Sequence, residues 1–261
     1  ERLNGIYANL LGTAGVDIHH GKAVLVDPNT IEIEGRRHTS KHILIATGGT
    51  PTVPKFPGSD LVITSNEAFY LPELPKKIVI VGGGYIAVEF AGIFAGLGVD
   101  TTLLYRGPLF LRGFDISIRE FVKNEISNKN INLMFDSDVS SIGSRGDYHI
   151  ISLSDGQEIS CDLVLYATGR KPNTADLGLE NTKVQLGERG QVLINERYQT
   201  GQNNIYAIGD VTDRIQLTPV AIEEGMFIAN QLFGDDGYPS LSYENIPTAV
   251  FCQPNIGTVG L

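Results

Sequence analysis

The sequence predicts an α/β fold with two Rossmann-like nucleotide-binding domains, whose parallel sheets carry three-stranded antiparallel meander insertions. One observation is a β-branched run, Ile78–Val81, followed by three glycines and then by apolar residues at helical spacing. A second is the tripeptide Ala-Thr-Gly, which ends an apolar strand at 46–48 and again at 167–169. Short alternating segments with turn residues between them supply the expected meanders. Because the same strand ending recurs, we expect two similar domains in the chain.

The composition excludes several classes of protein. The 261 residues are 42% hydrophobic, which is enough for a packed core and for two domains. A net charge of −10 argues against a nucleic-acid surface. No apolar run approaches the length of a membrane span, so no membrane association is expected. The first residue is Glu1 and no signal peptide precedes it, so we expect part of a longer protein.

The cysteines and histidines do not form a recognisable metal or redox motif. Cys161 and Cys252 are far apart and make neither CxxC nor CxxxxC spacing. The five histidines are scattered among polar segments, so no metal site is expected. So few cysteines fit a reducing compartment.

The glycine turn after Ile78–Val81 has the spacing of a dinucleotide-binding motif, G-x-G-x-x-A at Gly82, Gly84 and Ala87. Gly82 permits a tight turn and Gly84 lets the backbone approach a pyrophosphate, with Gly83 between them. The following helix then presents unpaired N–H groups and a positive dipole end to the phosphates. The alternative is an ordinary strand-to-helix turn of an α/β protein.

The second strand of this unit, Val99–Tyr105, ends without the acid that binds the adenosine ribose in NAD-preferring sites. Arg106 stands at the strand end, and Arg112 follows in the same loop. Two guanidinium groups suit bidentate, charge-assisted binding of a 2′-phosphate, so the loop favours NADPH over NADH. The alternative is that both arginines are only solvated.

Further candidate residues lie on the helix after the glycine turn and at the end of a third strand. Tyr85 and Glu89 are four residues apart and therefore share a helix face. Because its neighbours on the helix are apolar, Glu89 is expected to be partly buried and to have a partner. The alternative is that Glu89 is solvated on an outer face of the helix. Asp210 ends a third buried strand, 204–210, where it can accept from a sugar hydroxyl or cap a turn. A helix follows over 218–233, with Thr218 as the expected N-cap and Pro219 at its first position.

The pattern predicts the remaining elements as follows. Residues 1–11 end a helix with Ile6, Leu10 and Leu11 on one face. A short helix spans 65–71 with Ser65 as its N-cap, and a longer one spans 115–128 with Asp115 as its N-cap. Strands are expected at 131–135, 138–142, 148–153 and 158–167, with a turn at 143–146. The longer helix offers its apolar residues for burial, namely Ile116, Phe121, Val122 and Ile126.

The chain resembles the glutathione-reductase branch of the flavoprotein disulfide reductases over essentially its whole length. The resemblance looks closest to the plant and cyanobacterial type. The segments that carry it are ATGG (46–49), VGGGYIAVEFAG (81–92), Arg106 and Arg112 before GFD (113–115), ATGRKPNT (167–174), YAIGDVTDRIQLTPVA (206–221) and IPTAVFCQPNIGTVGL (246–261).

The resemblance implies a domain map and two cofactors, FAD and NADPH. Residues 1–50 and 171–240 belong to an FAD-binding domain, 71–170 to an NADPH-binding domain, and 245–261 begin an interface domain of a homodimer. The implied FAD contacts are Ala23, Thr47, Gly48, Asp210 and Thr218. The implied NADPH contacts are Gly83, Ile86, Arg106, Arg112, Gly169, Leu217 and Ala249. Tyr85 would shield the flavin until nicotinamide displaces it, and Glu89 would pair with a lysine beside the flavin.

The implied activity is NADPH-dependent reduction of glutathione disulfide, with hydride passed to FAD and then to a redox disulfide. That disulfide, its lysine, the first FAD motif and a catalytic His-Glu pair are not in this sequence, so we expect the chain to be inactive alone. A dihydrolipoamide dehydrogenase should carry an acid in place of Arg106. A mercuric or trypanothione-type reductase stays open, as does a non-catalytic NADPH-binding module. A cytoplasmic location is expected, with a plastid as the alternative.

Overall fold

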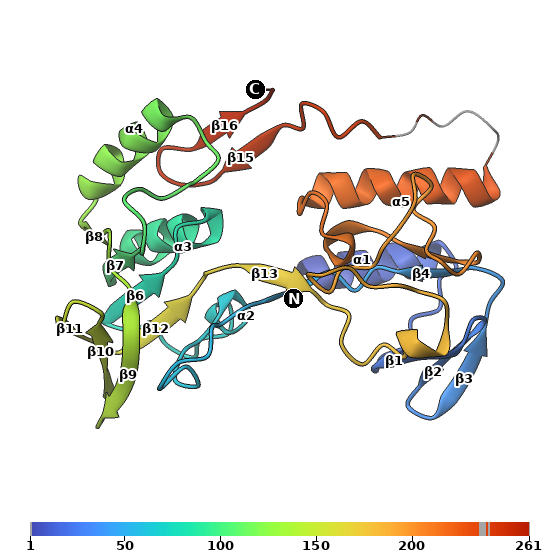
Figure 1. Cartoon of the computed structure of the whole chain (residues 1–261), viewed down its shortest axis with the longest axis horizontal. Coiled ribbons are helices and arrows are strands. Elements are labelled where there is room, and N and C mark those ends of the chain that lie inside the picture. The colour runs from blue at the N-terminus through green and yellow to red at the C-terminus, as the bar shows by residue number, and fades with distance from the viewer. Residues whose placement is uncertain (1, 235–238, 240, 261) are drawn as a thin grey trace. The chain divides into compact units, whose positions relative to one another are not determined.

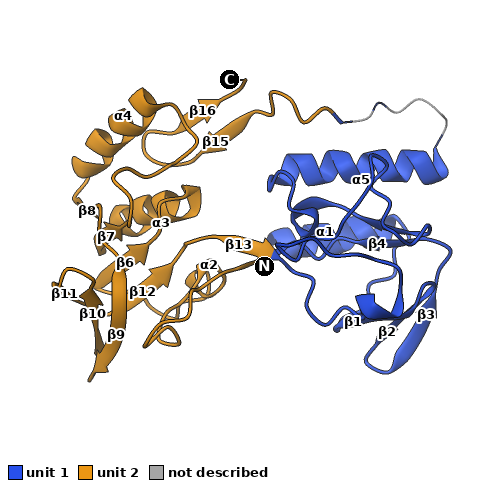
Figure 2. Cartoon of the chain, viewed as in Figure 1, with its two compact units in different colours: residues 1–49, 172–241 blue, residues 50–171, 242–261 orange. Residues whose placement is uncertain are grey.

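The chain folds into two compact units, each made from two separate stretches of sequence (Figure 2). The computed structural model describes residues 2–234, 239 and 241–260. Unit 1 comprises 1–49 and 172–241, and unit 2 comprises 50–171 and 242–261. Residues 245–261, predicted to begin an interface domain, are grouped with unit 2. The assignment of these stretches to individual cofactors remains a prediction.

Unit 2 is built on a four-stranded parallel sheet with the order β12-β6-β7-β8 (Figure 1). The β-branched run forms the central strand because residues buried on both faces need no polar alternation. Ile78, Val79 and Ile80 have no solvent-exposed surface. The parallel sheet confirms the predicted α/β class. Its strands are β6 (Lys77–Val81), β7 (Asp100–Leu104), β8 (Ile131–Met134) and β12 (Leu163–Tyr166).

The two faces of this sheet are covered by different elements. On one face Ile80 and Leu103 pack with α3 (Tyr85–Gly96) and α4 (Ile116–Ser127), which contribute Phe94 and Val122. On the other face the alternate strand residues pack against Ile142, Ile151 and Leu153 of an antiparallel sheet. Strand side chains point to opposite faces in turn, so one sheet serves two cores.

The antiparallel sheet of unit 2 has the order β11-β10-β9 and is the predicted meander. Its strands are β9 (Val139–Arg145), β10 (Tyr148–Leu153) and β11 (Glu158–Cys161). The turn predicted at 143–146 was placed too early, because β9 continues to Arg145. The strand predicted over 158–167 is two strands. Asp162 separates them: its N–H donates to the Lys77 carbonyl at 3.0 Å, and its carboxylate accepts from the Lys77 N–H at 2.8 Å.

Unit 1 contains a smaller parallel pair, β4 (Ile43–Ile45) and β14 (Ile205–Ala207), together with the second three-stranded meander. Ile43, Ile45 and Ile205 form the centre of its core. The meander strands are β1 (Ala23–Asp27), β2 (Thr30–Ile33) and β3 (Arg36–Thr39). The helices are α1 (Arg2–Thr13), η1 (Leu179–Asn181), η2 (Gly209–Thr212) and α5 (Thr218–Phe233).

The short elements complete the chain. A two-stranded sheet joins β5 (Gly49–Pro51) and β13 (Arg170–Pro172), and a hairpin joins β15 (Thr248–Val250) and β16 (Ile256–Thr258). Helix α2 (Ser65–Ala68) is shorter than predicted, and its N-cap is Thr64 rather than Ser65. Thr64 forms a capping box with Glu67, which fixes the start one residue earlier.

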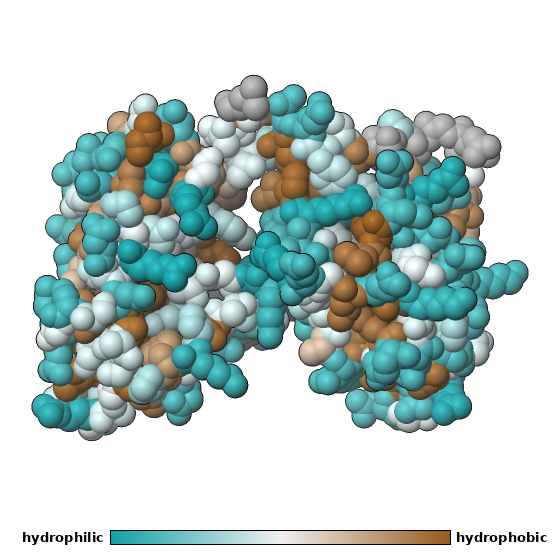
Figure 3. All heavy atoms as spheres, viewed as in Figure 1, coloured by the Kyte–Doolittle hydropathy of each residue, from teal (hydrophilic) through white to brown (hydrophobic). Residues whose placement is uncertain are grey.

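Some apolar residues on the predicted helix faces are at the surface, where hydrophobic side chains reach solvent in several places (Figure 3). Ile6, Leu10 and Leu11 of α1 are 42%, 60% and 42% exposed, and α1 buries no residue. In α4, Val122 and Ile126 are buried as predicted, whereas Ile116 and Phe121 are exposed. Helical spacing identifies an apolar face, but burial also needs an element that covers it.

Candidate functional site

The three glycines after β6 have different surroundings. Gly82 adopts a φ of 152°, and a Cβ there would lie 2.3 Å from the Ala167 carbonyl oxygen. A Cβ on Gly83 would lie 2.4 Å from the Tyr105 ring. A Cβ on Gly84 would meet no atom within 4 Å. Packing therefore accounts for the first two glycines, whereas the third borders open space where a ligand can approach the backbone.

Gly84 is also the N-cap residue of α3, and no side chain caps this helix start. The first N–H groups of an α-helix have no intrahelical acceptor, so an uncapped start suits an anion. Ile86 is half-buried in this first turn. The strand, turn and helix thus have the geometry that phosphate binding requires.

The loop after β7 presents Arg106 and Arg112 next to the glycine turn. The Leu111 N–H donates to the Gly83 carbonyl at 2.6 Å, which joins the loop to the turn. Leu109, Phe110 and Leu111 are 6%, 0% and 2% exposed, so the middle of the loop is part of the core. The two arginines flank this buried segment and are exposed. Within the described part of the chain, neither guanidinium makes a hydrogen bond or ion pair.

Tyr85 and Glu89 lie on α3, directly after the turn. Tyr85 is 42% exposed. Glu89 is half-buried, and its carboxylate accepts from the Phe251 N–H at 2.9 Å, so the C-terminal hairpin β15–β16 is tied to α3. Ala249, which is exposed, lies in β15 two residues before Phe251. The structure therefore brings Ala249 to the α3 side of unit 2.

Gly169 follows β12 at the same sheet edge. It is exposed with a φ of 144°, and its carbonyl accepts from the Thr52 N–H at 2.9 Å. Because β12 and β6 are parallel neighbours, Gly169 and the glycine turn both follow the carboxyl ends of adjacent strands. This edge is where open α/β sheets bind ligands.

A second strand-end site lies in unit 1. β4 and β14 are parallel, and the Ile208 N–H donates to the Ile45 carbonyl at 3.1 Å, so Thr47, Gly48 and Asp210 follow strands at one edge. Asp210 is partly buried in η2. The Thr47 hydroxyl donates to the Asn173 carbonyl at 2.7 Å.

The start of α5 differs from the prediction by one residue. The N-cap is Leu217, which places Thr218 at the first helical position and Pro219 at the second. No side chain caps this start either, and Thr218 is exposed. Leu217 belongs to unit 1, whereas the other predicted NADPH contacts belong to unit 2. Ala23 is exposed at the start of β1 in unit 1.

Glu224 is a buried charged residue that the sequence analysis missed. It is 1% exposed, and its carboxylate accepts from the Gly209 N–H at 2.7 Å, which fixes the turn before Asp210. The signal was available, because Val220, Glu224 and Ile228 are spaced four apart and all are buried in α5. A carboxylate on an otherwise apolar helix face needs a hydrogen-bond partner.

Neither cysteine is suited to act as a nucleophile near neutral pH. Burial, with a smaller effect of Asp162, raises the pKa of the Cys161 thiol to about 11. Burial also raises the pKa of Cys252, whose thiol donates to the Pro254 carbonyl at 3.0 Å. The thiolate is the reactive form, so these thiols are inert. Cys161 lies in β11 and Cys252 packs beside Val250, so both are core residues.

Metal-binding clusters and membrane-spanning helices are both absent from the described residues. No group of three or more histidine, cysteine, aspartate or glutamate side chains there could hold a metal ion. No helix in the described part of the chain combines the length and the apolar character needed to cross a membrane.

Comparison with protein families identifies a family that matches most of this chain. Residues 1–225 match the family described as "Pyridine nucleotide-disulphide oxidoreductase". The chain belongs to the pyridine nucleotide-disulphide oxidoreductase family. The family match spans the glycine turn, the arginine loop and the start of α5.

Curated relatives match this chain at 42–44% identity over the aligned residues. It is 44% identical to glutathione reductase of Burkholderia cepacia and 44% identical to that of Nostoc sp.. It is 42% identical to the chloroplastic/mitochondrial glutathione reductase of Pisum sativum. All of this chain is covered, but it spans only 58%, 59% and 47% of those proteins.

A solved structure of a flavoprotein disulfide reductase has the same fold. It is the HOCl-induced flavoprotein disulfide reductase RclA of Escherichia coli, with a TM-score of 0.92 at 29% identity. The match covers 99% of this chain and 60% of that one. The predicted fold class and the predicted family are therefore confirmed.

Proposed function

We propose that this chain is the coenzyme-binding part of an NADPH-dependent flavoprotein disulfide reductase whose substrate is glutathione disulfide. The proposal is supported by three curated relatives named glutathione reductase, each at least 42% identical. In this proposal unit 2 binds NADPH and unit 1 contributes to binding of FAD. The whole protein is proposed to be an enzyme and a homodimer, located in the cytoplasm or a plastid.

The observation that carries the proposal is the arginine loop after β7. In an NAD-preferring site this strand end has an acid that accepts from the ribose hydroxyl. Here Tyr105 and Arg106 follow β7, and Arg112 stands at the far end of the loop. Both guanidinium groups are exposed, so each can form charge-assisted bonds to a 2′-phosphate without breaking an existing ion pair. This arrangement disfavours the alternative of a dihydrolipoamide dehydrogenase.

The glycine turn supports binding of the pyrophosphate. Gly84 leaves open space beside the uncapped start of α3. Gly82 and Gly83 instead pack closely against Ala167 and the Tyr105 ring. Phosphate oxygens at this position accept from backbone N–H groups and lie at the positive end of the helix dipole. Ile86, Gly169 and Ala249 are proposed to contact the remainder of the nucleotide.

The strand-end site of unit 1 supports binding of FAD. We assign Asp210 to accept from a flavin hydroxyl or to stand near its pyrophosphate, with Thr47, Gly48 and Thr218 as further contacts. The Gly209 N–H is held by the buried Glu224 carboxylate, which keeps the Asp210 turn in place. Ala23 is proposed to contact the flavin nucleotide through its backbone.

FAD and NADPH, when bound, would supply the redox chemistry, namely hydride transfer and delivery of electrons to a disulfide. The residues of this chain bind and orient. We propose that Tyr85 shields the flavin and moves aside for nicotinamide, and that Glu89 pairs with a lysine beside the flavin. Cys161 and Cys252 are buried thiols with raised pKa values, so the redox disulfide is assigned to residues outside this chain.

The test is a comparison of two coenzymes in two proteins. NADPH and NADH dissociation constants are measured by fluorescence titration for the wild type and for the double variant Arg106→Ala with Arg112→Ala. Two lost charge-assisted contacts should weaken NADPH binding by roughly 100-fold and leave NADH nearly unchanged. An equal loss for both coenzymes would contradict the 2′-phosphate role.

Two competing functions are separated from this proposal by a different measurement. A mercuric or trypanothione-type reductase would share the NADPH site and differ in the disulfide or metal substrate that the whole protein reduces. A non-catalytic module would bind NADPH and never reduce a flavin. Turnover of glutathione disulfide by the whole protein, measured as NADPH oxidation, separates these cases.

A further inference from the structure

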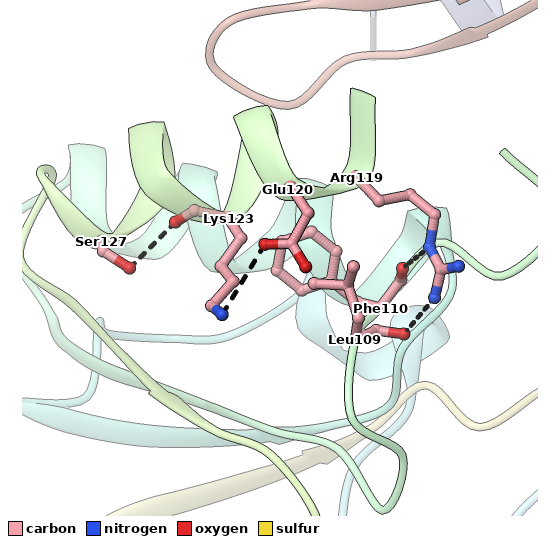
Figure 4. A network of polar contacts seen from close by, with 6 residues as sticks. All are labelled: Leu109, Phe110, Arg119, Glu120, Lys123 and Ser127. Carbon is pink, nitrogen blue, oxygen red and sulfur yellow. Dashed lines mark hydrogen bonds and ion pairs between the residues drawn. The ribbon is translucent and has the colours of Figure 1, made fainter. Parts of the chain in front are cut away.

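We propose that Arg119 is a positioning residue for coenzyme selectivity, because it holds the loop that carries Arg106 and Arg112. This inference rests on the proposed 2′-phosphate site and names a residue of α4 that contacts the backbone of the loop. Figure 4 shows the arrangement, with Arg119 reaching from α4 to Leu109 and Phe110.

The contact is a two-pronged hydrogen bond to the backbone. Nε of Arg119 donates to the Phe110 carbonyl at 2.8 Å, and Nη2 donates to the Leu109 carbonyl at 2.6 Å. The guanidinium is planar and offers donors in a fixed fork, so it sets the spacing and orientation of two successive peptide groups. These peptides lie midway between Arg106 and Arg112 in the sequence.

The backbone beside this contact is strained and therefore needs support. Leu111 has a φ of 55°, an unfavourable conformation for a residue with a branched side chain. Three interactions hold it there: its own N–H donates to the Gly83 carbonyl, its carbonyl accepts from the Phe114 N–H at 3.1 Å, and the Arg119 fork fixes the two residues before it. Without the fork, the carbonyls of Leu109 and Phe110 lose charge-assisted donors. The loop can then relax, and Arg112 moves with it.

The first part of the loop has anchors of its own, whereas the part beyond Phe110 is held by the Leu111 N–H and by the Phe114 N–H, which donates to the Leu111 carbonyl at 3.1 Å. The Tyr105 N–H donates to the Met134 carbonyl at 2.8 Å, and the Asp136 N–H donates to the Gly107 carbonyl at 3.1 Å. The Tyr105 ring is also packed against Gly83 and Gly107. Arg106 is therefore held independently of Arg119, whereas Arg112 depends in part on the segment that Arg119 fixes. Losing Arg119 should weaken one of the two phosphate contacts.

Lys123 provides a matched control on the same helix. Its ammonium lies 3.8 Å from the Glu120 carboxylate and 5.6 Å from the centre of the Phe135 ring. Lys123 has the same charge as Arg119 and lies one turn further along α4 (Figure 4). Among the described contacts, its side chain makes no hydrogen bond to the loop.

The experiment measures dissociation constants for NADPH and NADH in the full chain carrying Arg119→Ala, Arg119→Lys or Lys123→Ala. The preference for NADPH over NADH should fall roughly tenfold in Arg119→Ala, because a misplaced Arg112 would contribute little binding free energy to the phosphate contact. Arg119→Lys keeps the charge without the fork, so it should lie between Arg119→Ala and the wild type. Lys123→Ala should keep the wild-type preference.

The outcomes separate the two proposals. An unchanged preference in folded Arg119→Ala, judged by its circular dichroism spectrum, would overturn the positioning role. If Arg119→Ala does not fold, the Arg119→Lys preference decides in the same way. A preference that survives Arg106→Ala with Arg112→Ala would instead overturn the 2′-phosphate site itself. A loss in Arg119→Ala equal to the loss in Lys123→Ala would show a general charge effect and would also overturn the inference.

Discussion

The tripeptide Ala-Thr-Gly ends one strand in each unit, and the two copies are built alike. In unit 1 the Thr47 hydroxyl donates to the Asn173 carbonyl at 2.7 Å, and in unit 2 the Thr168 hydroxyl donates to the Thr52 carbonyl at 3.0 Å. The glycine after each threonine has a positive φ, 69° at Gly48 and 144° at Gly169. Each strand end is thus tied by its threonine to a segment distant in sequence.

The strands that lead into these endings are covered differently. In β12, Val164 and Leu165 are both fully buried, because helices cover one face of the sheet and the meander covers the other. In β4, Ile43 and Ile45 are 5% exposed but Leu44 between them is 45% exposed. The local sequence therefore determines how a strand ends, whereas neighbouring elements determine whether both of its faces are buried.

The largest expected effect tests this difference in burial. Leu165→Ala should lower the free energy of unfolding by about 2–5 kcal/mol, because it leaves a cavity in the core between the sheet and α3. Leu44→Ala should cost less than about 1 kcal/mol, because its side chain is already partly in water. Urea denaturation followed by circular dichroism measures both in the 261-residue chain. Equal costs for the two variants would show that β4 is as well covered as β12.

The next effect separates packing glycines from ligand glycines in unit 2. Gly83→Ala should destabilise the chain by about 1–3 kcal/mol, because the added methyl group would overlap the Tyr105 ring. Gly84→Ala should cost about 1 kcal/mol or less and still weaken NADPH binding, because the methyl group would occupy the space proposed for phosphate. Thermal unfolding and coenzyme titration report the two quantities separately. Tight NADPH binding by Gly84→Ala would contradict the phosphate position.

A smaller effect compares the two threonines directly. Thr47→Val and Thr168→Val each remove one hydroxyl donor and should each cost about 0.5–1.5 kcal/mol. Similar losses in urea denaturation would support the view that the two strand ends are equivalent. Serine at either position keeps the hydroxyl and serves as the control. A loss confined to one unit would mean that the repeated sequence has a structural role in that unit alone.

The smallest effect concerns helix starts, where α4 has a side-chain cap and α5 has none. Hydrogen bonds from Ser117 and Ile118 lower the pKa of the Asp115 carboxyl. A lowered folded pKa means that Asp115 contributes stability above its unfolded pKa, and that this contribution is lost as the pH falls through the folded value. Asp115→Asn keeps a cap without a charge, so it should lose less stability than the wild type between pH 5 and about pH 2. Identical pH profiles would show that Asp115 does not contribute through its charge.

Much of this architecture was predictable, because it depends on local pattern. The central strand, the glycine turn, α3 and the Asp115 cap of α4 are all encoded in neighbouring residues, and the structure contains them. The N-caps of α2 and α5 were misplaced by one residue, since Ser65 and Thr218 are good capping residues next to the true cap positions. Composition alone does not choose between adjacent candidates.

The missed residues depend on contacts between elements that are distant in the fold. Arg119 reads as a solvated helix residue until the loop from Leu109 to Leu111 is seen to lie under it. Phe251 gives no sign in the sequence that its N–H will bond to Glu89. Glu224 was different, because its position on an apolar helix face was visible and was overlooked. The exposed faces of α1 and α4 were beyond prediction, because periodicity does not say what covers a helix.

The hydrogen bond between Glu89 and Phe251 joins residues that are 162 positions apart, and this separation has a consequence for synthesis. Residues 172–241 of unit 1 must leave the ribosome before the hairpin can reach α3. Until then the nascent chain exposes the surface that Val250 and Cys252 later cover, each 1% exposed in the finished fold. Transiently exposed apolar surface is what chaperones bind and what aggregates. Unit 2 is therefore expected to be most vulnerable during translation, in the interval before its last segment arrives.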